Sequence, residues 1–210
     1  MAKFSKEFLI WRMIPGQQYH VFNHANGNEN LFIEERNYPF FLEKLSKHIL
    51  PVCRLFCYCL MPNHFHLILQ VRHEEELQRI WQKSDTSIRL TQKQLELKTS
   101  KSFANLFSSY TQSFNKVYNR MGSLFIPSMK VEAITDDNHF CKAIHYCHAN
   151  PVHHGFVKKI ADWPNSSYKI FLSKSPTKLE REYVLDMFGG LQAFIKYHDQ
   201  PIDIKQKFIE

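Results

Sequence analysis

The pattern of apolar and polar positions changes its period several times along the chain. Aromatic and branched residues fill Gln18 to His24, and a polar AsnGly-containing turn follows at Ala25 to Asn30. Such a run before such a turn predicts a first strand. From Asn37 to Leu50 the apolar residues recur at helical spacing until Pro51 ends the pattern, which predicts a first helix. The chain therefore opens with a strand followed by a helix.

Two further apolar runs, Val52 to Leu60 and His64 to Val71, are separated only by Met61-Pro62-Asn63. Proline and asparagine favour a tight turn, so the two runs predict an antiparallel hairpin of central strands. A polar stretch from Glu74 to Ser102 follows, rich in Gln, Lys, Ser and Thr. Because it has no continuous apolar stripe, we expect a surface insertion over 74–102 with at most partial helix.

Apolar residues three or four apart predict a second helix from Ser102 to Met121, ending at Gly122. The partly apolar segment from Leu124 to Ile134 predicts another strand. Thr135-Asp136-Asp137 has the composition of a helix N-cap, so a third helix is expected from Asn138 to Asn150, closed by Pro151.

The predicted order is strand, helix, strand, strand, helix, strand, helix. Its first six elements match the split βαβ arrangement of a ferredoxin-like (RRM-like) sheet, so we expect an α+β fold with a central antiparallel sheet and helices on one face. From about Pro176 the spacing of apolar residues predicts a short helical tail. The expected domains are therefore 1–170, which carries the sheet, and a C-terminal helical extension over 171–210.

Charge and cysteine usage narrow the class of protein. The 210 residues have a net charge of +7, and no acidic residue lies between Glu96 and Glu132. A basic face there suits a polyanion, although a merely solubilising surface explains the charge equally well. Five cysteines, an odd number, argue against a disulfide framework. The apolar stretch Phe8 to Trp11 is too short for a signal-peptide core or a spanning helix, so a cytoplasmic location without membrane contact is expected.

Two pairs of residues carry candidate chemistry. In a strand, alternation places His64 and His66 on one face and Phe65 on the other, so the two imidazoles are able to hold a divalent metal. Tyr146 and Asn150 project from one side of the third predicted helix. A phenol can attack phosphorus if a metal or a base stabilises charge, and an amide oxygen can complete a metal site. Each pair also has an ordinary reading, as hydrogen-bonded histidines among the 12 in the chain, or as a core tyrosine with a capping asparagine.

The string Cys59-Leu60-Met61-Pro62-Asn63-His64-Phe65-His66-Leu67-Ile68 resembles the MPNHxH signature of the single-tyrosine HUH transposases. These form the insertion-sequence-200-like group, which includes the REP-associated tyrosine transposases. The resemblance continues in the family's order through the end of the second predicted helix, the third predicted helix and the string after it. The matching segments are Phe114 to Phe125, Tyr146 to Gly155 (YCHANPVHHG) and Trp163 to Tyr168. Together they extend over about residues 18–170.

Carried over by position, the resemblance implies His64 and His66 as metal ligands and Tyr146 as the nucleophile. Asn150 falls where relatives supply a third ligand, although some use Gln there. The implied reaction is cleavage of single-stranded or hairpin DNA through a 5′-phosphotyrosine intermediate, followed by rejoining, as in DNA transposition and recombination. Mg²⁺ or Mn²⁺ is the implied cofactor, because it polarises the scissile phosphate.

The same resemblance suggests DNA contacts on the basic second helix and beyond it. Lys116 and Arg120 lie one turn apart and are candidates for phosphates, while an aromatic ring such as that of Tyr118 is a candidate for base stacking. Asn119 and Lys130 complete this predicted DNA-binding set.

Other interpretations stay open at this point. One is a non-catalytic nucleic-acid-binding protein on the same sheet, with the site retained but inactive. Another is a structural zinc site built from Cys57, Cys59, His64 and His66, although the two cysteines lie on an apolar strand and suit a buried position. A homodimer with the tyrosine acting across the interface and a monomer are both consistent with the sequence.

Overall fold

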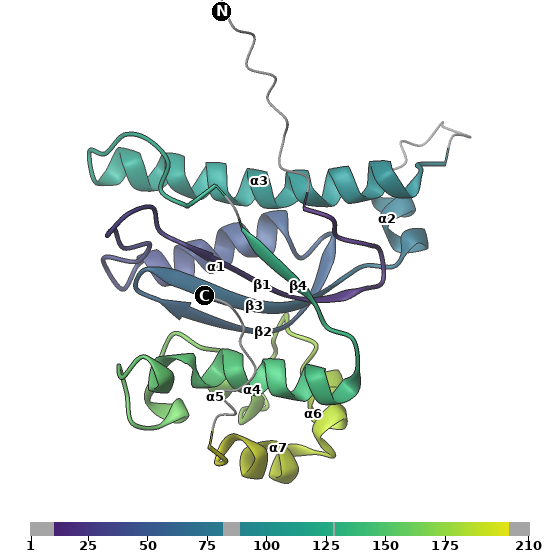
Figure 1. Ribbon diagram of the computed structural model, residues 1–210, viewed down its shortest axis with the longest axis vertical. Coiled ribbons are helices and arrows are strands. Elements are labelled where there is room, and N and C mark those ends of the chain that lie inside the picture. Colours follow the sequence, from purple (N-terminus) through teal and green to yellow (C-terminus); the bar gives the residue numbers. More distant parts are fainter. Residues whose placement is uncertain (1–10, 82–88, 128, 202–210) are drawn as a thin grey trace, which may run out of the picture.

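The computed structural model describes residues 11–81, 89–127 and 129–201, which form a sheet between two layers of helices (Figure 1). The predicted insertion at 74–102 and the predicted tail at 171–210 each extend partly outside the described residues. Of the apolar stretch Phe8 to Trp11, only Trp11 is described. In the described part, no helix has the length and apolar character needed to cross a membrane.

The sheet has four strands, β1 (Gln18–His24), β2 (Cys53–Met61), β3 (His64–Val71) and β4 (Lys130–Ala133). Their order is β2-β3-β1-β4 and each neighbouring pair is antiparallel. This order is compatible with the expected ferredoxin-like arrangement and confirms the α+β class. The predicted bounds of β1 and β3 agree with the structure, whereas β4 is much shorter than the strand expected from Leu124 to Ile134.

One face of the sheet is covered by the helices that connect its strands, α1 (Asn37–His48) and α3 (Gln92–Val117), with α2 (Glu74–Trp81) at the end of α3. Phe65 of β3 points into this layer, where its ring centroid lies 5.2 Å from that of Phe41. Tyr110 of α3 is buried in the same layer, and its hydroxyl donates to the carbonyl of Leu31 at 2.6 Å. These aromatic contacts fix α3 over α1 and the sheet.

Helix α3 begins ten residues earlier than predicted and ends at Val117 rather than Met121. Thr91 caps it through a capping box in which its hydroxyl accepts from the backbone amide of Gln94 at 3.3 Å and the Gln94 side chain accepts from the amide of Thr91 at 2.8 Å. Leu95 and Thr99 are buried although their neighbours are polar. Much of the polar stretch is thus helix with a narrow buried stripe, which is why its composition resembled a loop.

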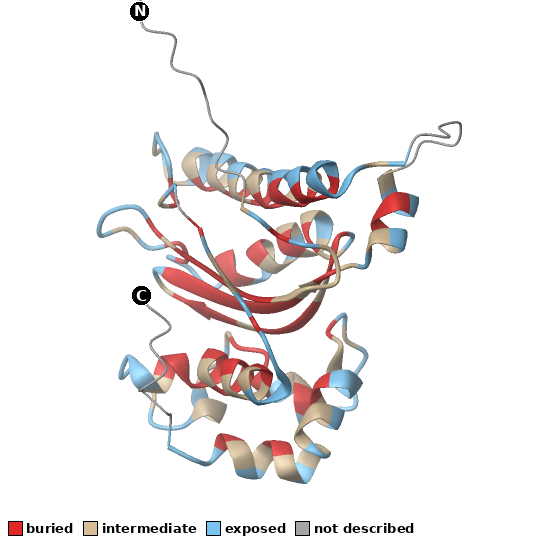
Figure 2. Ribbon diagram, turned by 45° about the vertical axis from the view of Figure 1, so that its right-hand side comes forward, coloured by how far each residue is buried: buried red, intermediate tan, exposed pale blue. Residues whose placement is uncertain are grey.

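The opposite face of the sheet is covered by α4 (Asp137–His153), so the prediction of helices on one face alone was wrong. Both faces of β2 and β3 are buried, as the red strands in Figure 2 show. Such doubly covered strands carry near-continuous apolar runs, which is the pattern that Val52 to Leu60 shows in the sequence. The helix α4 extends across this face, and its middle and end lie against the hairpin.

The caps of α4 explain its length. The Asp136 carboxylate accepts from the amide of His139 at 2.8 Å, which confirms the predicted N-cap. At the other end the helix passes Pro151 and continues to His153, in contrast to the predicted stop. The helix can pass the proline because proline lacks only its own backbone N–H group. The carbonyls of Asn150 and Pro151 still accept hydrogen bonds, from the amides of His154 at 3.0 Å and Phe156 at 2.9 Å.

Beyond α4 the chain forms a helical layer beneath it. Its elements are the 3₁₀ turn η1 (Ile160–Asp162), α5 (Tyr168–Phe171), α6 (Arg181–Phe188) and α7 (Leu191–His198). The predicted helical tail is confirmed in its described part by α6 and α7. A hydrogen bond of 3.0 Å between Nδ1 of His148 and Nε2 of His198 connects α7 to α4.

Candidate active site

The candidate site lies between the sheet and α4, on the face opposite α1 and α3. His64 and His66 of β3 point to this face and are buried, while Phe65 points away from it. Tyr146 and Asn150 lie one turn apart on α4 and face the same two histidines. The structure therefore brings together the four residues that the sequence singled out for chemistry.

The contact between His64 and Asn150 closes one side of the site. Nε2 of His64 lies 2.9 Å from Oδ1 of Asn150, and both side chains are buried. On the other side of the ring, Nδ1 of His64 lies 2.8 Å from Oδ1 of Asn63. Since amide oxygens only accept, a neutral His64 donates to one of these two oxygens and turns the lone pair of its other nitrogen toward the second. With its proton on Nδ1, His64 has the lone pair of Nε2 beside the Asn150 oxygen, and a cation bound to both atoms would stabilise that arrangement.

His66 lies beside His64, with ring centroids 5.2 Å apart. Its Nδ1 lies 2.9 Å from Nε2 of His20 on the neighbouring strand β1. Its Nε2 is buried and has no hydrogen-bond partner among the described residues. Burial lowers the pKa of His66 well below its usual range, with smaller contributions from the surrounding histidines, so the ring is neutral near neutral pH. A neutral imidazole is the form that binds a metal ion.

Tyr146 approaches this pair of histidines with its ring. The centroid of its ring lies 5.7 Å from that of His66 and 5.9 Å from that of His20, edge-on in both cases. The side chain is half-buried. Its position beside His66, at the boundary between the buried site and solvent, suits a nucleophile that has to meet a large substrate.

The residues present fit a hard divalent cation with open coordination positions. His64 and His66 of β3 supply imidazole nitrogens and Asn150 of α4 supplies an amide oxygen. The 2.9 Å between Nε2 of His64 and Oδ1 of Asn150 is a separation that two ligands of one ion adopt. Bonds of about 2.1 Å at right angles place neighbouring ligand atoms about 3 Å apart. The buried Nδ2 of Asn150 has no hydrogen-bond partner among the described residues. Such unsatisfied polar atoms are expected where a ligand completes the site.

A zinc site with cysteine ligands finds no support in the described residues, because they contain no group of three His, Cys, Asp or Glu side chains arranged to hold a metal. Cys57 and Cys59 are fully buried. Burial raises the pKa of Cys59 well above its usual range, so this sulfur is a thiol rather than the thiolate that zinc binds. The cysteines are packing residues of the sheet.

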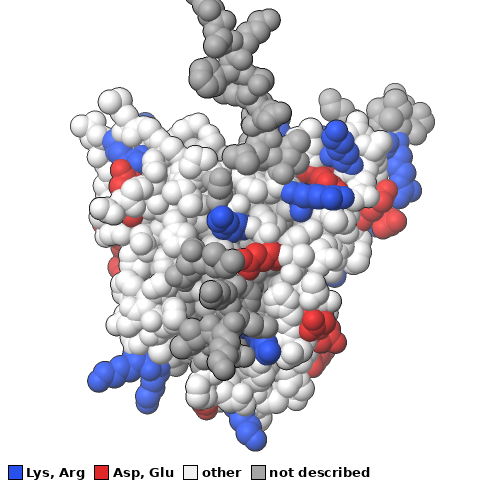
Figure 3. Space-filling view, in the orientation of Figure 1, with Lys and Arg blue, Asp and Glu red and all other residues white. Residues whose placement is uncertain are grey.

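The predicted DNA-binding residues are spread over two regions. Lys130 is exposed on β4 and pairs in register with Phe22, whose ring lies 5.5 Å from that of His66, so Lys130 lies on the face of the sheet that carries the site. Lys116 is exposed near the end of α3, on the other side of the sheet. On the surface shown in Figure 3, basic side chains are scattered between acidic ones and form no single patch.

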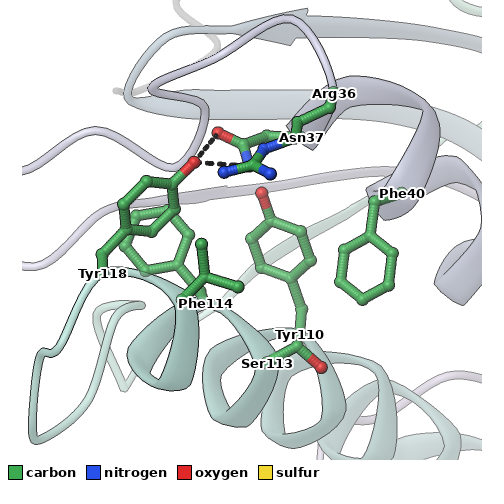
Figure 4. Close-up of a pocket in the computed structure, with 8 residues that line it drawn as sticks. Arg36, Asn37, Phe40, Tyr110, Ser113, Phe114 and Tyr118 are labelled. Atoms are coloured by element: carbon green, nitrogen blue, oxygen red, sulfur yellow. Dashed lines mark hydrogen bonds between the residues drawn. The ribbon is translucent and has the colours of Figure 1, made fainter.

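Tyr118, Asn119 and Arg120 form the turn after α3. The Tyr118 hydroxyl is hydrogen-bonded to the Asn37 amide group in a pocket between α1 and α3, within 3.1 Å of its oxygen and 3.0 Å of its nitrogen (Figure 4). Asn119 adopts the left-handed region at φ 49°. Arg120 forms an ion pair with Glu29 and donates to the carbonyl of Ser123 at 2.8 Å. Tyr118 and Arg120 thus have structural contacts of their own.

Sequence reasoning missed the residues behind His66. His20 is fully buried beside it, and Glu132 of β4 lies across from His20 in register, with Oε2 3.7 Å from Nδ1. The signal for His20 was present, since His20, Phe22 and His24 alternate along QYHVFNH and share one face. No local pattern identified Glu132, because its role depends on strand pairing.

Comparisons with known proteins agree with this fold. No protein-family model matches the chain. A Haemophilus influenzae protein named "Putative REP-associated tyrosine transposase" is 28% identical over 112 residues, which are 52% of this chain and 56% of the relative. The chain thus matches little more than half the length of that relative.

A solved structure of a REP-associated tyrosine transposase bound to a REP hairpin has a TM-score of 0.56 with this chain. The two share 17% sequence identity, and the alignment covers 84% of this chain and 89% of the other. At this identity the likeness concerns the fold. In local sequence and in fold, the chain is similar to the REP-associated tyrosine transposases.

Proposed function

We propose that this protein is a metal-dependent single-strand DNA endonuclease of the HUH type, a transposase that cleaves and rejoins DNA at hairpin-associated sites. The observation that carries the proposal is the meeting of His64, His66 and Asn150 with Tyr146 on one face of the sheet. The similarity to REP-associated tyrosine transposases in sequence and fold supports it.

The reaction assigned to Tyr146 is a transesterification. Its phenol oxygen attacks the scissile phosphorus, the new bond joins phosphorus to the tyrosine, and the bond from phosphorus to the 3′ oxygen breaks. The phenol gives up its proton, and the departing 3′ oxygen takes one. Attack by the free 3′-hydroxyl on the phosphotyrosine reverses the step and rejoins strands without an external energy source.

His64, His66 and Asn150 would hold Mg²⁺ or Mn²⁺. When bound, such an ion supplies Lewis-acid polarisation of the phosphate and stabilises the developing charge. The chain itself contributes position, because β3 and α4 are both packed in the core and keep the tyrosine beside the ligands. The DNA partner would reach the site past Lys130, which lies exposed on the same face.

The test is incubation with labelled single-stranded hairpin DNA from the gene's own neighbourhood and Mn²⁺, followed by denaturing electrophoresis. We expect a covalent protein–DNA adduct that disappears in Tyr146→Phe. Tyr183→Phe is the matched control, because this exposed tyrosine lies on α6, and should leave the adduct intact. Hairpin binding without any adduct in the wild type would instead favour the non-catalytic DNA-binding protein.

A further inference from the structure

His66 is the first of three side chains from three strands that follow one another across the sheet. Nδ1 of His66 on β3 lies 2.9 Å from Nε2 of His20 on β1, and Nδ1 of His20 lies 3.7 Å from Oε2 of Glu132 on β4. Both imidazoles are fully buried, whereas about a third of the Glu132 side chain is exposed. The three groups form a line from the edge of the sheet to the site.

Glu132 determines which ring nitrogen carries the proton in His20 and, through His20, in His66. A carboxylate has lone pairs and no proton, so its charge favours the form of His20 that carries its proton on Nδ1. The 3.7 Å separation is longer than a good hydrogen bond, but the attraction acts inside a protein where charges are weakly screened. With Nδ1 protonated, Nε2 of a neutral His20 is an acceptor.

His66 must then be the donor in the contact with His20. A proton on Nδ1 of His66 satisfies the 2.9 Å contact and leaves its Nε2 with a free lone pair. This Nε2 is the buried atom without a hydrogen-bond partner among the described residues. Metal-binding histidines commonly donate their other N–H to a partner that fixes the ring and its tautomer.

We propose that Glu132 and His20 are positioning residues that hold His66 in the tautomer with a free Nε2 and aim that nitrogen into the metal site. This inference rests on the proposed function for the identity of the ligand. The tautomer itself follows from contacts within the chain and is measurable without metal or DNA.

The first measurement is long-range ¹H–¹⁵N correlation NMR on metal-free protein labelled with ¹⁵N-histidine, near neutral pH. We expect His66 to show a protonated Nδ1 and an unprotonated Nε2. Glu132→Gln should shift part of the His66 population toward the opposite tautomer, because a carboxamide can either donate to or accept from His20. Asp137→Asn, which removes an exposed carboxylate from the first turn of α4, should leave the tautomer unchanged.

The second measurement is Mn²⁺ affinity, followed by electron paramagnetic resonance of the free ion. Glu132→Gln should weaken Mn²⁺ binding by about 10- to 100-fold, the range found when partners behind a metal ligand are removed. His20→Leu should do the same, and His20→Gln should recover part of the loss because its amide oxygen accepts from His66. A merely structural role predicts the reverse order, since leucine suits a buried position better than glutamine.

A wild-type His66 protonated on Nε2 in the metal-free protein overturns the inference. So does Glu132→Gln protein with unchanged tautomer and Mn²⁺ affinity. If instead the wild type has the expected tautomer and binds no Mn²⁺, the positioning stands and the metal-dependent function fails.

Discussion

The surroundings of Asn150 in the structure suit the ligand role that the sequence suggested for it. Its amide is fully buried on α4 with the oxygen 2.9 Å from Nε2 of His64. The sequence singled out His64, His66 and Tyr146 because helical and strand periods place residues on faces. It could not identify Glu132, whose contact with His20 arises from the pairing of β1 with β4.

Replacing Asn150 with alanine should weaken Mn²⁺ binding by at least about tenfold, because the third ligand is lost. Asn138→Ala is the matched control, since this asparagine is exposed in the first turn of the same helix. Isothermal titration with Mn²⁺ measures both variants. Equal affinities in the two would remove Asn150 from the proposed ligand set.

At the scale of elements, strands were predicted better than helix ends. The bounds of β1 and β3 were predicted from the alternation in QYHVFNH and from the apolar run His64 to Val71. Both could be predicted because a half-buried or fully buried strand has a strong local pattern. The start of α3 was missed because its first turns bury only a few small or apolar side chains among polar ones. The position of α4 under the sheet is a tertiary property and has no local period.

The capping box of α3 provides a test at this scale. Thr91→Ala removes the hydroxyl that accepts from the Gln94 amide, so the free energy of unfolding should fall by about 1 kcal/mol. Thr111→Ala, in the interior of the same helix, should cost less or stabilise the protein, because alanine is the better helix former. Urea unfolding followed by circular dichroism compares them. Equal losses would mean that the cap contributes nothing at residue 91.

For the whole molecule, the two buried histidines that connect α7 to α4 should make the free energy of unfolding depend on pH. Burial lowers the pKa of His198 to about 3 and that of His148 well below its usual range. Below about pH 6.5 the unfolded chain therefore binds protons that the folded chain does not, so stability falls as the pH drops from about 6.5 toward 3.

The slope approaches about 1.4 kcal/mol per pH unit for each such histidine. Replacing His198 with glutamine, whose side chain does not titrate, should reduce the slope of unfolding free energy between pH 6 and about 4. His153→Gln, an exposed histidine at the end of α4, is the control and should leave the slope unchanged. An unaltered slope in the His198 variant would show that this residue is not the buried neutral group described.

Long-range electrostatics offers a second test of the whole molecule, which rests on the proposed function. The slope of log binding constant against log salt concentration measures the number of phosphate contacts. Lys130→Ala and Lys116→Ala should each reduce this slope for hairpin binding by about one, because both side chains are exposed. Arg120→Ala should change it less, since its guanidinium is paired with Glu29. Fluorescence anisotropy across a salt series gives the slopes. An unchanged slope in both lysine variants would place the DNA path elsewhere.

In the proposed reaction Tyr146 becomes covalently bonded to DNA. Mass spectrometry detects such a bond in protein that has been incubated with hairpin DNA and Mn²⁺ and then digested with nuclease and protease. We expect the peptide containing Tyr146 to carry a nucleotide through its tyrosine oxygen, and no other tyrosine to carry one. A nucleotide on a different residue, or adduct formation that persists in Tyr146→Phe, would contradict it.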